Sequence, residues 1–160
     1  MLNLKATLLK KLKGFKKIAV IGIGSSLKSD DAAGILIAKK LEKYGNPKLK
    51  VFIGSTAPEN LTGEIIKYGP SHIIIIDSAN MEQEPGNIQL IEPEDAGGVS
   101  FTSHMLPIKI MVDYLLESIK CEILIIGIQP KSLEFGGNLS KEVADSVKQI
   151  TEAIQSVIGQ

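Results

Sequence analysis

Four side chains have the residue types and spacing that metal-assisted or acid/base chemistry requires: Asp30, Asp31, Asp77 and His104. Asp30 and Asp31 are adjacent, Asp77 directly follows the apolar run Ile73–Ile76, and His104 leads into an amphipathic stretch. Carboxylates and an imidazole together make an incomplete site for a divalent transition metal, with positions open for a substrate or for a metal that the substrate carries. These residues therefore favour acid/base or metal-assisted catalysis.

Each of these residues also has a simpler explanation. Carboxylates in the first turn of a helix, as predicted for Asp30 and Asp31, are stabilised by the helix dipole by about 0.3–1 kcal/mol. A loop histidine such as His104 is often only a solvated or capping side chain. Asp77 favours the functional interpretation, because an acid at the end of an apolar strand needs water, a hydrogen bond or a cation.

The segment that positions the paired acids reads as strand, loop and helix. An apolar run over residues 17–23 ends at Gly22 and Gly24, a polar loop follows, and an amphipathic pattern covers residues 31–44. The acids then lie at the carboxyl edge of the strands, where open α/β sheets bind ligands. A phosphate usually occupies this place at a helix N-terminus, so two acids there favour a cation instead.

A nucleotide-binding module is the alternative that this pattern raises. Gly22-x-Gly24 follows a strand, but the third glycine of the dinucleotide motif falls at Leu27. The next strand also lacks a terminal acid to hold a ribose. The motif is therefore incomplete.

The order of apolar segments predicts the fold class. Strands are expected at residues 17–23, 50–54, 72–77, 88–91 and 122–128, and helices at 31–44, 59–68, from Met105 or Pro107 to Ile119, and after Ser140. Alternating strands and helices indicate a three-layer αβα sandwich around a mostly parallel, twisted, five-stranded sheet, with one edge strand antiparallel. The long loops near 80–103 and 129–138 are expected to determine which substrate is recognised.

Length and composition predict a single α/β domain over residues 1–160, with a basic amphipathic extension (1–16) and a core domain (17–158). Two interpretations of the extension stand: a surface helix packed on the domain, or a targeting, membrane-docking or partner-docking segment. No apolar run is long enough for membrane insertion.

All 18 basic residues are lysines, which argues against sequence-specific nucleic-acid binding. The single cysteine favours a cytoplasmic location.

Several motifs together resemble those of a known protease family. The segment from Gly22 to Gly34 is similar to the pattern GxGNxLxxDDxxG of the hydrogenase maturation endopeptidases, the HycI and HybD type. The strand that ends in Asp77, the loop residue His104, the segment 126–130 and the segment 139–143 also agree. The resemblance covers roughly residues 16–158.

The resemblance implies an aspartyl-type peptidase, a hydrolase that removes the C-terminal extension from the nickel-loaded precursor of a nickel-iron hydrogenase large subunit. Its partner is then that precursor, and its only cofactor is nickel supplied by the substrate, with no organic cofactor. A non-catalytic, nickel-dependent chaperone or checkpoint for the precursor is the other interpretation, beside the nucleotide-binding module.

The resemblance also assigns roles to residues. It places the metal contacts at Asp31, Asp77 and His104, and the catalytic acids at Asp30, Asp31 and Asp77. Gly22, Gly24 and Ser25 support the loop. Ser25 replaces the asparagine of the family, which keeps a hydrogen-bonding group but shortens its reach.

Overall fold

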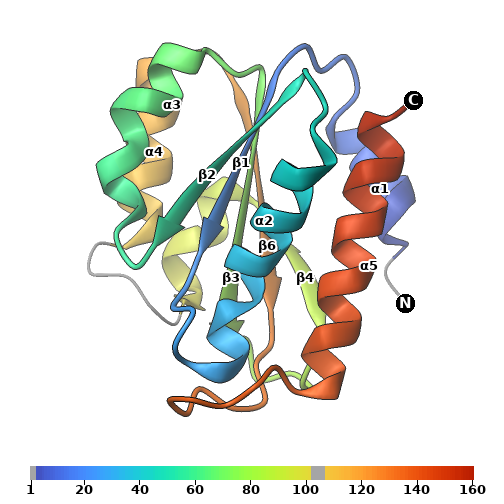
Figure 1. Cartoon of the computed structure of the whole chain (residues 1–160). Helices are drawn as coiled ribbons and strands as arrows, with labels where there is room; N and C mark the ends of the chain where they lie inside the picture. Colours follow the sequence, from blue (N-terminus) through green and yellow to red (C-terminus); the bar gives the residue numbers. More distant parts are fainter. Residues whose placement is uncertain (1–2, 102–106) are drawn as a thin grey trace.

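The computed structural model describes residues 3–101 and 107–160, and within these ranges six strands form one sheet (Figure 1). The strands follow the order β2-β1-β3-β6-β4, and β5 pairs with β3 beside this path. β1, β2, β3 and β6 are parallel, whereas β4 and β5 are antiparallel to their neighbours. The strands are β1 (Ile18–Ile23), β2 (Leu49–Ser55), β3 (His72–Asn80), β4 (Ile88–Ile91), β5 (Ser100–Phe101) and β6 (Glu122–Ile128).

Both faces of the central strand β3 are covered, as its unbroken apolar run requires. Ile73, Ile74, Ile75 and Ile76 are all fully buried. Because side chains alternate along a strand, Ile74 and Ile76 enter one hydrophobic core while Ile73 and Ile75 enter the other. The sheet is therefore the middle layer of the molecule.

Helices form the two outer layers (Figure 1). One face of the sheet packs against α1 (Leu4–Lys11), α2 (Ala33–Tyr44) and α5 (Lys141–Ile158), and the other against α3 (Thr62–Tyr68) and α4 (Ile108–Ser118). Three short 3-10 turns complete the described elements: η1 (Ser29–Ala32), η2 (Pro58–Leu61) and η3 (Pro93–Gly98). The predicted αβα sandwich, with a mostly parallel sheet and an antiparallel edge strand, is confirmed.

The basic N-terminal stretch forms a helix that packs on the domain. Leu4, Leu8 and Leu12 are buried in the same core as Ile154 and Val157 of α5. The lysines of this stretch are exposed. Because its leucines are part of the hydrophobic core, the helix is part of the folded domain. In the described residues, no helix has the length and apolar character needed to cross a membrane.

Three details differ from the expected elements. β3 continues three residues beyond Asp77, where Ala79 and Asn80 pair with the two-residue strand β5. The helix expected to start at Asp31 begins at Ala33, preceded by η1. The helix expected over residues 59–68 likewise begins with a separate turn, η2, and α3 starts at Thr62. Met105, one of the two expected starts of the following helix, lies outside the described residues.

Candidate active site

The structure brings the three predicted aspartates to one edge of the sheet, and it buries all of them. Asp30 and Asp31 lie on η1, which follows the loop after β1, and Asp77 lies on the neighbouring strand β3. Asp30 and Asp77 are fully buried, and Asp31 is 1% exposed. Three carboxylates withdrawn from water must be stabilised by hydrogen bonds, protons or cations.

The loop that follows β1 and begins at Gly24, here called the glycine loop, fixes the position of Asp31. Gly24 has a φ of +141°, and a Cβ there would lie 1.9 Å from the Asp31 carbonyl oxygen. The Ser25 backbone N–H donates to Asp31 Oδ2 at 2.9 Å, and Asp31 N–H donates to the Lys28 carbonyl at 2.8 Å. The contact from residue 25 to Asp31 thus uses the backbone, which serine provides as well as asparagine.

Close contact between α2 and the sheet sets the position of η1. A Cβ on Gly34 would lie 2.4 Å from the Ile76 carbonyl oxygen and 2.6 Å from that of Ile23. A Cβ on Gly22 would in turn lie 2.6 Å from the Gly34 carbonyl oxygen. These two glycines let the start of α2 approach β1 and β3, which brings the acids of η1 beside Asp77.

Of the three aspartates, Asp77 has the environment least favourable to an ionised carboxylate. Its Oδ1 accepts a hydrogen bond from Ser78 N–H at 2.8 Å, whereas its buried Oδ2 has no hydrogen-bond partner among the described residues. Burial raises the pKa of Asp77 well above its usual range, the charge of Asp31 raises it further, and the Ser78 N–H lowers it only in part. This environment favours the protonated form of Asp77, and a nearby cation would favour the ionised form.

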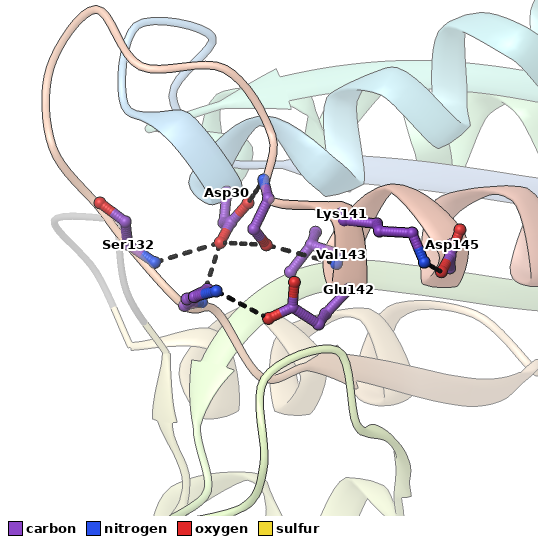
Figure 2. Close-up of polar contacts among 8 residues, drawn as sticks. Asp30, Ser132, Lys141, Glu142, Val143 and Asp145 are labelled. Carbon is purple, nitrogen blue, oxygen red and sulfur yellow. Dashed lines mark hydrogen bonds and ion pairs between the residues drawn. The ribbon is translucent and has the colours of Figure 1, made fainter.

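Asp30 has a different environment, because four donors bind its carboxylate (Figure 2). Oδ2 accepts from the backbone N–H groups of Lys131 and Ser132 at 2.8 and 3.1 Å and from the Ser140 hydroxyl at 2.9 Å. Oδ1 accepts from Ser140 N–H at 2.7 Å. This geometry ties the loop between β6 and α5 to η1 and gives Asp30 a positioning role.

The link continues into α5 and β3. Ser140 is the N-cap of α5, where its hydroxyl also accepts from Val143 N–H at 3.3 Å. The Ser78 hydroxyl donates to the Asp30 carbonyl at 3.0 Å. Asp30 therefore joins a loop, a helix and the central strand at the candidate site.

Two polar residues at this edge were missed in the sequence. Gln129 follows the apolar run of β6, and its Oε1 accepts from Met81 N–H at 2.7 Å while its Nε2 donates to Asn80 Oδ1 at 3.3 Å. Ser78 follows Asp77 on β3. Ser78 lies late in β3 and Gln129 directly follows β6, and a position at the end of an apolar parallel strand is the same signal that pointed to Asp77.

The remaining predicted ligand, His104, lies outside the described residues. Within those residues no group of three or more histidine, cysteine, aspartate or glutamate side chains is arranged to hold a metal ion. His72, which was given no role, begins β3 at the opposite edge, with its Nε2 2.8 Å from Glu122 Oε2. The predicted assignments of metal and catalytic roles remain predictions.

Comparison with known proteins identifies the family. The family model described as hydrogenase maturation protease, HycI, matches residues 35–157. The hydrogenase 3 maturation protease of Escherichia coli is 31% identical over 134 residues, covering 83% of this chain and 85% of its own. The chain belongs to the hydrogenase maturation protease family.

Solved structures of this family share the fold. The chain is similar to the [NiFe] hydrogenase maturation protease HycI from Thermococcus kodakarensis, with a TM-score of 0.89 at 25% identity over 96% of this chain and 99% of that one. It is also similar to the hydrogenase 3 maturation protease structure, with a TM-score of 0.77 at 31% identity over 85% and 87%. The family is one of hydrolases, and these findings support the protease interpretation rather than a checkpoint or a nucleotide-binding module.

Proposed function

We propose that this protein is the endopeptidase that removes the C-terminal extension from the nickel-loaded precursor of a nickel-iron hydrogenase large subunit. The observation that carries the proposal is the buried Asp77 Oδ2, which has no hydrogen-bond partner among the described residues and lies close enough to Asp31 to be affected by its charge. A carboxylate pair in this state is suited to a cation that arrives with the substrate.

Electrostatics explains how nickel would be recognised. Burial raises the pKa of Asp77, and the charge of Asp31 raises it further, because two ionised carboxylates repel each other at a buried site. A divalent cation reverses the balance, because it attracts both carboxylates where little water screens the charges. Asp31 and Asp77 would then bind a precursor that carries nickel and reject one that lacks it.

The third ligand in this proposal is His104, on the basis of the family resemblance. Nitrogen and oxygen donors are an accepted set for nickel, and three of them leave positions open for the ligands that the precursor already provides. Because Asp31 and Asp77 are buried, their carboxylates have to become accessible when the precursor's metal binds.

In this proposal, hydrolysis depends on how the site positions the precursor's tail. Holding the precursor's metal against Asp31 and Asp77 fixes the nearby tail, so that water and the peptide carbonyl meet in a defined geometry. The nickel charge polarises the carbonyl or the attacking water, and Asp31 and Asp77 are the groups available to move the proton. Asp30 keeps its predicted catalytic assignment only as a prediction, since four donors already bind its carboxylate.

The partner in this proposal is the precursor polypeptide, and the proposed location is the cytoplasm, consistent with a chain that has one cysteine. No organic cofactor enters the proposed reaction.

The test is a processing assay of nickel-loaded precursor, read by mass spectrometry, with Asp31→Asn and Asp77→Asn variants. We expect at least a hundredfold loss of cleavage rate for each, because each removes a charge that faces the precursor's nickel. Asp113→Asn is the control, since Asp113 is half-exposed on α4 in an ion pair with Lys109. Cleavage by both site variants at the wild-type rate would contradict the proposed site.

A further inference from the structure

Two large apolar side chains stand out on the surface of the described residues. Phe135 is 73% exposed and Leu27 is 67% exposed, more than any other large hydrophobic residue in the described ranges. Leu27 lies on the loop that leads from β1 into η1, and Phe135 lies on the loop between β6 and α5. Neither belongs to the two hydrophobic cores.

Hydrogen bonds and a cation–π contact hold these two loops together. Gly136 N–H donates to the Leu27 carbonyl at 2.9 Å. The Lys28 ammonium lies 5.1 Å from the centroid of the Phe135 ring. Leu27, Lys28 and Phe135 therefore lie on two joined loops, and we name these three residues the loop platform.

The platform is anchored in the buried part of the molecule. Ser29 adopts a left-handed φ of 42°, and its hydroxyl donates to the Glu134 carbonyl at 2.6 Å. One residue later, Asp30 binds Lys131, Ser132 and Ser140 (Figure 2). Buried contacts thus fix the backbone on both sides of the exposed side chains, and the structure presents Leu27 and Phe135 to solvent from a fixed base.

Fixed apolar groups of this kind are typical of binding surfaces. Apolar residues that are clustered on an exposed surface, with a large aromatic among them, mark sites where proteins contact a partner. The base of the platform also carries Asp31, four residues after Leu27, so the surface continues from the loops that hold the candidate active site. A chain whose metal site contacts Asp31 and Asp77 therefore passes near the platform.

We propose that Leu27, Lys28 and Phe135 dock an apolar segment of the precursor polypeptide. This inference rests on the proposed function and names the surface that gives the protease its affinity for the substrate chain. Phe135 is the aromatic anchor, Leu27 adds apolar area, and Lys28 holds the ring in place through its ammonium group. Docking adds affinity for the polypeptide, whereas the acids bind the metal.

The experiment measures both binding and cleavage of nickel-loaded precursor by the full-length protein. Leu27→Ser and Phe135→Ser are compared with Ile110→Ser and Tyr114→Ser, whose side chains are 51% and 52% exposed on α4. We expect the platform variants to raise KM and the dissociation constant about tenfold or more, with kcat changed less than twofold. The α4 variants should leave both values unchanged.

Each other outcome is decisive. Equal KM and affinity for wild type and platform variants, with cleavage intact, would overturn the platform and leave the proposed function standing. Precursor that is bound but never cut would contradict the protease, while the binding arm still tests the platform. A change of oligomeric state in sedimentation, without loss of precursor affinity, would show that the platform joins two copies of this chain and would overturn the proposal.

Discussion

At the scale of single residues, the site depends on how three neighbouring aspartates are stabilised in different ways. Four donors bind Asp30, the Ser25 N–H binds Asp31, and one oxygen of Asp77 has no hydrogen-bond partner among the described residues. Residue type and position predicted which acids gather at the edge. Their separate environments depend on donors from distant segments, such as Ser140, which no local pattern reveals.

Asp77→Asn tests the buried acid through stability. Because the pKa of Asp77 is raised in the folded protein, its favourable contribution is complete below the unfolded pKa and is lost as pH rises through the folded pKa. The variant should therefore gain stability relative to wild type on going from pH 4 to pH 8, by about 1.4 kcal/mol for each unit of the pKa shift. Urea unfolding of both metal-free proteins at several pH values measures this, and parallel pH profiles would contradict it.

At the scale of elements, η1 depends on close packing between the glycine loop and the start of α2. The apolar run of β1 and the pattern of α2 predicted the strand–loop–helix unit around these acids. The 3-10 turn that carries them was not predicted, since it arises where Gly24 and Gly34 let distant backbones approach. Such contacts exist only in the folded chain.

Gly24→Ala should disrupt this unit. The φ of +141° and the 1.9 Å approach to the Asp31 carbonyl leave no room for a methyl group, so we expect a loss of about 2–4 kcal/mol in unfolding free energy. Cleavage should also fall, because Asp31 is displaced. In the matched control, Gly63→Ala on α3, a Cβ meets no described atom within 4 Å, and stability should rise by about 0.5–1 kcal/mol. Equal effects of the two substitutions would refute the packing argument.

At the scale of the whole molecule, the N-terminal helix belongs to the fold. Hydrophobic periodicity predicted the main helices and the five longer strands, because their apolar runs match the layers that bury them. The two-residue strand β5 was missed, since it forms only by pairing with the end of β3. The apolar face of α1 packs with α5, which favours the packed-helix interpretation of the basic stretch.

Leu8→Ala and Leu9→Ala compare the two faces of α1. Leu8 is fully buried and Leu9 is 40% exposed. We expect Leu8→Ala to lower the unfolding free energy by about 2–5 kcal/mol, because it leaves a cavity in the core that α1 shares with α5. Leu9→Ala should change it by less than about 0.5 kcal/mol. Thermal or urea unfolding measures both, and a Leu8→Ala variant as stable as wild type would mean that α1 does not support the domain.

We propose that this protein cuts a hydrogenase precursor after recognising its nickel. The most direct test incubates the wild-type protein with nickel-loaded and with nickel-free precursor and follows the mass of the precursor over time. We expect loss of the C-terminal extension from the nickel-loaded precursor and at least a hundredfold slower loss from the nickel-free one. An unchanged mass of the loaded precursor, or equal cleavage of both, would contradict it.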